Sequence, residues 1–161
     1  MTVRFPSGPP ERNHCRFSFE SLSVADMPEL RVFIAENDGA WTELTELTEG
    51  ERPVVRLSAP NLQEAARRRR RLPADVAVVL DLAVSVADDP RTALAAISDH
   101  DAGAGVRYAG TVDGLAGLVA DLVVAGVADG VTLIPVGTDD LGPRAYAALS
   151  RIQDRLRIRA A

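Results

Sequence analysis

Short runs of apolar residues recur along the chain and are separated by turn residues. The longest cover residues 30–35, 53–57, 76–86 and 131–134, and a further extended run covers 106–109. These runs are almost continuously apolar instead of alternating with polar residues, which is typical of strands covered on both faces. The pattern therefore predicts about four buried strands in a parallel sheet.

Helical spacing of apolar residues fills the stretches between these runs. Helices are predicted over residues 62–72, 91–98, 111–125 and 143–159, and another over 40–48. Thr111 is placed to cap its helix, and Gly126 follows where a helix end needs a residue that tolerates positive φ. The last helix is expected to face inward through Tyr146, Leu149, Ile152 and Leu156. Strands alternating with helices predict βαβ units with right-handed crossovers.

Composition and charge exclude several classes of protein. The chain has 161 residues, a net charge of −5 and 18 basic residues, all arginine, so it lacks the footprint of a nucleic-acid-binding domain. No apolar run reaches the ~18 residues of a membrane span. The N-terminus lacks the apolar centre of a signal peptide, and the single cysteine, Cys15, excludes an internal disulfide. We therefore expect a cytoplasmic protein that binds neither membrane nor nucleic acid.

The stretch from Gly110 to Pro135, GTVDGLAGLVADLVVAGVADGVTLIP, resembles the closing segment of the luciferase-like monooxygenase family. In that family the last helix and strand commonly read as GT, a helix, AG, DG and an apolar strand ending in proline. The run from Val54 to Pro90 resembles the family's segment between its sixth and seventh barrel strands. The resemblance covers roughly residues 28–161 and implies a TIM barrel that uses FMN or the deazaflavin F420.

The length of the chain allows only part of such a barrel. A whole TIM barrel takes ~200 residues at the least, so we expect an α/β fold of the partial, half TIM-barrel-like type, a βα array with about four parallel strands. Residues 1–24 are expected to form an N-terminal tail or arm, and residues 25–161 a single α/β domain. Since a half barrel leaves strand edges exposed, we expect a homodimer or a complementary barrel subunit, with the arm covering an edge.

Two functions from different classes follow from the resemblance. The first is a truncated flavin- or F420-dependent oxidoreductase, in which a dimer or partner restores the cofactor site at the carboxyl ends of the strands. The second is a non-catalytic scaffold or regulatory subunit. The loop at residues 36–39, ENDG, favours the second, because its two carboxylates would repel a flavin phosphate.

Three residues are candidates for chemistry. Gly110 and Thr111 stand at a predicted helix N-terminus, where free N–H groups and the helix dipole attract anions, so they are candidates for cofactor binding. A plain helix cap is the alternative for both. Asp81 interrupts an apolar strand and is a candidate catalytic carboxylate with a pKa raised by burial. The alternative for Asp81 is a bond to the backbone or to Arg56.

The histidines and the cysteine are expected to have no chemical role. His100 is flanked by Asp99 and Asp101, but three adjacent residues rarely converge on one metal ion, so no metal site is predicted. His14 falls in the predicted tail. Cys15 is interpreted as a partly buried structural thiol, because no histidine partner is fixed near it.

The five-arginine run at residues 67–71 is the strongest local concentration of charge. On a helix these side chains spread around the circumference instead of forming one patch. Glu64 stands four residues before Arg68, at the spacing of a helical ion pair. We therefore interpret the run as a solvated helix face.

Overall fold

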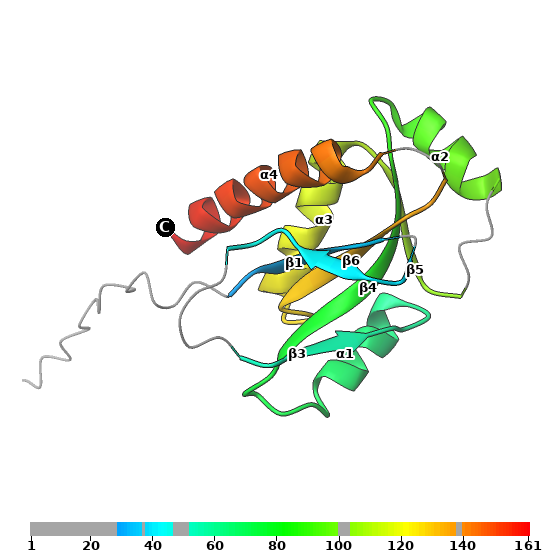
Figure 1. Cartoon of the computed structure of the whole chain (residues 1–161). Coiled ribbons are helices and arrows are strands. Elements are labelled where there is room, and N and C mark those ends of the chain that lie inside the picture. Colours follow the sequence, from blue (N-terminus) through cyan, green and yellow to red (C-terminus); the bar gives the residue numbers. More distant parts are fainter. Residues whose placement is uncertain (1–28, 37, 47–51, 100–103, 138–139) are drawn as a thin grey trace, which may run out of the picture.

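One curled sheet of mostly parallel strands forms the centre of the structure (Figure 1). The computed structural model describes residues 29–36, 38–46, 52–99, 104–137 and 140–161. Its strands are β1 (Arg31–Ala35), β2 (Trp41–Glu43), β3 (Val54–Leu57), β4 (Ala77–Val86), β5 (Val106–Gly110) and β6 (Gly130–Pro135). The predicted arm at residues 1–24 lies outside the described residues.

The sheet has the order β2-β1-β6-β4-β3, and β5 also pairs with β4. All of these pairings are parallel except that of β1 with β2. β4 can pair with three strands because it is long. β3 pairs with its first half and β5 with its second half, while β6 pairs along the opposite edge. The predicted α/β class and partial-barrel-like sheet are confirmed. The parallel strands number five in the described chain, against about four expected.

Four helices follow strands in the described ranges: α1 (Leu62–Arg69), α2 (Pro90–Asp99), α3 (Val112–Val124) and α4 (Gly142–Ala160). On β4 every second side chain, including Leu80 and Leu82, joins an apolar cluster with Leu115 and Val119 of α3 and Ile152 of α4. Fully burying such a side chain contributes about 1.5–3 kcal/mol. This layer of helices against one face is the main core. No helix in these ranges combines the length and apolarity needed to cross a bilayer.

The opposite face of the sheet curls inward, and we call it the inner face; it carries Phe33, Trp41, Arg56, Asp81 and Thr132. Register places Phe33, Thr132 and Asp81 in one row across β1, β6 and β4. The curl brings the two ends of the sheet order together, since Arg56 of β3 lies 5.8 Å from the ring centroid of Trp41 on β2.

The helix predicted over residues 40–48 is wrong, because Trp41–Glu43 form the antiparallel strand β2. A turn with φ 86° at Gly39 reverses the chain after β1. Trp41 then stacks on Phe33, with ring centroids 4.4 Å apart, and Glu43 pairs with Arg31. These cross-strand contacts outweigh the weak helical spacing, which is how context overrides local propensity.

Tyr146 was predicted to face inward from the last helix and is instead 58% exposed. Leu149, Ile152 and Leu156 are buried as predicted. The buried stripe begins one residue earlier, at Ala145, and continues at three- and four-residue spacing. The small alanine allows close packing of α4, and Tyr146 lies beside that stripe.

Asp129 and Gly130 fasten the amino edge of the sheet. The Asp129 carboxylate accepts a 2.8 Å hydrogen bond from the Val78 amide and pairs with Arg52 at 3.3 Å and Arg69 at 3.2 Å. A Cβ atom at Gly130 would lie 1.7 Å from the carbonyl oxygen of Arg31, so only glycine allows β1 to approach β6 there. Asp129 and Gly130, the DG pair of the stretch from Gly110 to Pro135, therefore have a structural role.

Candidate functional site

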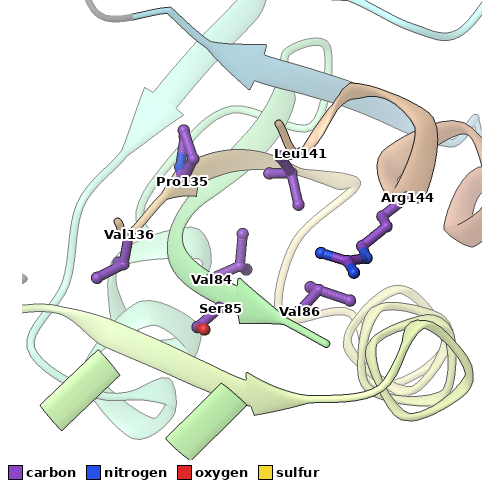
Figure 2. A pocket seen from close by; sticks show the side chains of 7 residues that line it. All are labelled: Val84, Ser85, Val86, Pro135, Val136, Leu141 and Arg144. Carbon is purple, nitrogen blue, oxygen red and sulfur yellow. The ribbon is translucent and has the colours of Figure 1, made fainter. Parts of the chain in front are cut away.

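The carboxyl ends of β4 and β6 border a small pocket, which we call the carboxyl-edge pocket. Its lining residues are Val84, Ser85, Val86, Pro135, Val136, Leu141 and Arg144. Figure 2 shows the Arg144 side chain reaching from α4 toward Val86 at the end of β4. In α/β sheets, ligands bind outside the carboxyl ends of parallel strands, so this pocket stands where a ligand site is expected.

Local backbone features bring Arg144 to the pocket. The Val136 amide donates to the Val84 carbonyl at 2.9 Å, which holds the chain against β4 just past β6. Gly137 then turns the chain with φ 96°. The Asp140 carboxylate accepts from the Gly142 amide at 3.0 Å, at the beginning of α4. Arg144 follows in the first turn, which fixes its side chain above the pocket.

The pocket combines apolar walls with a single cation. Arg144 lies 3.9 Å from the carboxylate of Asp88, at the limit of an ion pair, and Asp88 is fully exposed. Ser85 is the polar residue of the wall contributed by β4, and it is buried. The pocket has a volume of about 10 Å³, room for about one water molecule, so its guanidinium suits only the anionic group of a ligand whose remainder lies outside the pocket.

Gly110 and Thr111 stand at the same edge of the sheet, at the beginning of α3. The predicted cap is confirmed, because the Thr111 hydroxyl accepts from the Gly114 amide at 3.2 Å. Tyr108 lies over this first turn and donates its hydroxyl to the Thr111 carbonyl at 2.8 Å. A Cβ atom at Gly110 would lie 2.4 Å from that hydroxyl, so the glycine makes room for the tyrosine. Cofactor binding by Gly110 and Thr111 stays a prediction.

Asp81 lies on the inner face, in the middle of β4, and not at the carboxyl edge. Its carboxylate accepts a 2.5 Å hydrogen bond from Nε of Arg56, so the alternative of an Arg56 bond is confirmed. The Asp81 side chain is 18% exposed. Its neighbour in the register, Thr132, is fully buried, and its hydroxyl has no hydrogen-bond partner within the described residues. The catalytic role of Asp81 stays a prediction.

A second ion pair, between Arg31 and Glu43, lies on the inner face and was not foreseen. Arg31 donates to both carboxylate oxygens of Glu43, and the Thr45 hydroxyl donates to one of them at 2.6 Å. Burial raises the pKa of Glu43, but the hydrogen bonds from Arg31 and Thr45 and the Arg31 charge outweigh it and hold the pKa below 4.5. A charged residue at the start of an apolar strand was the signal in the sequence.

The arginine run is a solvated helix face only in part, because α1 ends at Arg69 and only Arg67 and Arg68 are exposed on the helix. Glu64 accepts hydrogen bonds from both Arg67 and Arg68, the latter at 2.8 Å. Arg69 points instead to Asp129 at the amino edge of the sheet. Arg70 is exposed.

Metal binding finds no support in the described ranges, where no three His, Cys, Asp or Glu side chains form a group able to hold an ion. The candidates His14, Cys15, His100 and Asp101 lie outside the described residues. No protein-family model matches this chain, and no curated protein matches it either.

Proposed function

We propose that this protein is a truncated, luciferase-like oxidoreductase subunit that uses FMN or F420 at the carboxyl-edge pocket once a second subunit completes the site. The position of that pocket, at the carboxyl ends of β4 and β6, is the observation that supports the proposal. The sequence resemblance of residues 110–135 to the closing segment of that family supports the choice of cofactor. The second subunit is either another copy of this chain or a complementary barrel half.

The residues of the pocket fit one part of such a cofactor. Arg144 offers a charge partner for an anionic group, whereas Val84, Val86 and Leu141 are at most 7% exposed and leave no room for a flat ring within this chain. FMN or F420 would supply the redox chemistry when bound. The pocket is small, whereas ligand sites usually bury most of the surface of a drug-sized ligand. A completing subunit is therefore part of the proposal.

A non-catalytic scaffold or regulatory subunit is the second candidate, and the inner face favours it. The only carboxylate proposed for catalysis, Asp81, is already held by Arg56 at 2.5 Å. Thr111 likewise uses its hydroxyl to cap its own helix. Asp81 and Thr111 thus both use their polar groups to stabilise the fold. This favours a role in binding a partner over a role in catalysis.

One experiment separates the two candidates. The purified chain is titrated with FMN and with F420 on a column that reports absorbance and mass together. The oxidoreductase proposal expects a cofactor band that elutes with a dimer, and Arg144→Ala should weaken binding about tenfold, the loss of one charge-assisted contact of ~1.4 kcal/mol. Arg151→Ala, an exposed arginine of the same helix, should leave binding unchanged.

A colourless protein that takes up neither cofactor, alone or as a dimer, would favour the scaffold. Binding that Arg144→Ala and Arg151→Ala weaken equally would place the cofactor elsewhere and remove the observation on which the proposal rests.

A further inference from the structure

The two segments that border the carboxyl-edge pocket leave the sheet toward opposite faces. β5 and β6 pair with opposite edges of β4, so the crossovers from β4 to β5 and from β5 to β6 run in opposite directions. Right-handed crossovers then place α2 and α3 on opposite faces of the sheet. Burial agrees, because Ala93 and Ile97 of α2 are buried outside the apolar cluster that α3 and α4 share. The pocket between β4 and β6 therefore lies where the helices of neighbouring strands part, the usual place of ligand sites in α/β sheets.

An ion pair joins the two sides of this pocket. Asp88 stands on the segment from β4 to α2 and Arg144 in the first turn of α4, with Oδ1 and Nη2 3.9 Å apart. The backbone on either side of Asp88 is held in place. The Ala87 amide donates to the end of β5 at 3.0 Å, and the Asp89 carboxylate accepts from the Thr92 amide of α2 at 3.0 Å. Asp88 thus meets Arg144 from a fixed backbone position.

The Asp88 carboxylate uses the same guanidinium that an anionic ligand requires. With the pair formed, the pocket holds about 10 Å³, enough for about one water molecule. Asp88 is fully exposed, and ion pairs of exposed side chains contribute little to stability, so an incoming anion can replace this one. Carboxylates and phosphates match the guanidinium of an arginine in the same way, through two parallel hydrogen bonds. A ligand with either group therefore competes with Asp88 for Arg144.

We propose that Asp88 is an internal competitor at the carboxyl-edge pocket. Without ligand it pairs with Arg144 across the pocket, and the carboxylate or phosphate group of a ligand takes its place and opens the pocket. Asp88 thereby selects ligands whose anionic group binds the guanidinium better than a side-chain carboxylate does. The inference rests on the proposed function for the location of the site, but not on the identity of the cofactor.

Titrations with FMN and with riboflavin, which lacks the phosphate group, test the competition. Asp88→Asn should bind FMN about threefold more tightly, because a neighbouring negative charge is removed, and Asp88→Glu should restore wild-type affinity. Riboflavin should bind both variants as it binds wild type. Asp75→Asn, which removes the same charge at an exposed position before β4, should leave FMN binding unchanged.

A double variant shows whether Asp88 acts through Arg144. In the Arg144→Ala background, Asp88→Asn should no longer tighten FMN binding. Equal tightening with and without Arg144 would show general charge repulsion and would overturn the proposal. FMN binding that depends on Arg144 but is unchanged in Asp88→Asn would also overturn it, while leaving the proposed function in place.

Inorganic phosphate provides a test that needs no cofactor. The nuclear magnetic resonance signal of the Arg144 Nε–H group, identified by its loss in Arg144→Ala, is followed during a phosphate titration. The signal should move at about threefold lower phosphate concentration in Asp88→Asn than in wild type. This result without any FMN binding would support the competition and reject the proposed function. A signal that neither phosphate nor FMN moves in either protein would overturn both.

Discussion

The guanidinium of Arg56 lies 5.8 Å from the centre of the Trp41 ring, although the two residues stand on strands at opposite ends of the sheet order. The same guanidinium donates to Asp81 in the middle of the sheet. Arg56 thus links β2, β3 and β4 across the inner face. A guanidinium over an aromatic ring contributes about 0.5–1 kcal/mol at exposed sites and more when water is excluded.

Replacing Arg56 should destabilise the fold through Asp81. Arg56→Gln leaves the mostly buried carboxylate without its charged donor, so we expect the free energy of unfolding to fall by about 1.5–3 kcal/mol. Urea unfolding followed by circular dichroism measures this change. Arg71→Gln, at an exposed position, is the control and should change stability by less than about 0.5 kcal/mol.

The double variant Arg56→Gln/Asp81→Asn should cost less than the sum of the two single changes, because the pair then disappears together. Additive costs would show that Arg56 and Asp81 stabilise the fold independently.

Gly130 should tolerate no side chain. Its added Cβ would lie 1.7 Å from the Arg31 carbonyl oxygen, and neither that oxygen nor the Gly130 backbone can move without breaking the pairing of β1 with β6. We expect Gly130→Ala to lose more than about 4 kcal/mol, the range of exceptional single changes, measured as the midpoint of thermal unfolding.

Gly117→Ala is the matched control, because Gly117 lies inside α3 and its added Cβ meets only the end of the Arg155 side chain at 3.9 Å. Alanine favours helix there, so this variant should gain about 0.5–1 kcal/mol. A wild-type melting temperature for Gly130→Ala would contradict the close approach of β1 and β6.

Stability should decline in acid partly through Glu43. The pKa of Glu43 is lower in the folded protein than its ordinary 4.5, so its stabilising contribution is present above pH 4.5 and is lost as pH falls through the folded pKa. Urea unfolding across this range should show a shallower decline in Glu43→Gln than in wild type.

Some acid dependence should persist in that variant. The pKa of Glu64 is lowered by hydrogen bonding from Arg68, and the pKa of Asp89 by the hydroxyl and amide of Thr92. At neutral pH, Glu43→Gln should also be less stable than wild type, since Arg31 is buried and loses the carboxylate to which it donates two hydrogen bonds. Identical slopes for the two proteins would exclude Glu43 as a source of acid sensitivity.

Tyr108 should titrate above its ordinary pKa. Burial, aided by the nearby Asp113 charge, raises the pKa of Tyr108 above 10.0. Because the folded pKa is raised, the stabilising contribution is complete below pH 10.0 and is lost as pH rises through the folded pKa. Tyr108→Phe should remove the late component of the tyrosinate absorbance titration and cost about 1 kcal/mol, the loss of one hydrogen bond.

Tyr146→Phe is the control for this experiment, since Tyr146 is 58% exposed and should change stability little. A single titration step that both variants reduce equally would show that Tyr108 is not shielded by the first turn of α3.

Much of the secondary structure could be predicted because it depends on local patterns. The continuous apolar runs predicted β1, β3, β4 and β6, and the threonine before an amphipathic stretch predicted the cap of α3. β2 could not be predicted in this way. Its three residues carry no periodic pattern, and only their contacts with Phe33 and Arg31 on the neighbouring strand make them a strand.

The residues of the candidate site could likewise be predicted from the sequence only in part. Asp81 and Thr111 were visible in the sequence as a carboxylate in an apolar run and a cap at a helix start. Arg144 was not, because its place at the pocket depends on β6 pairing with β4 and on the turn at Gly137.

Apart from β2, the sequence by itself determined which segments are strands or helices, since burial periodicity and capping act within a few residues. Only the tertiary structure decided which strands are neighbours, that Arg56 reaches both Asp81 and Trp41, and that Gly130 must lack a side chain. The physical reason is that these relationships depend on contacts between residues far apart in the chain. Their energies depend on the curl and register of the sheet and not on any local pattern.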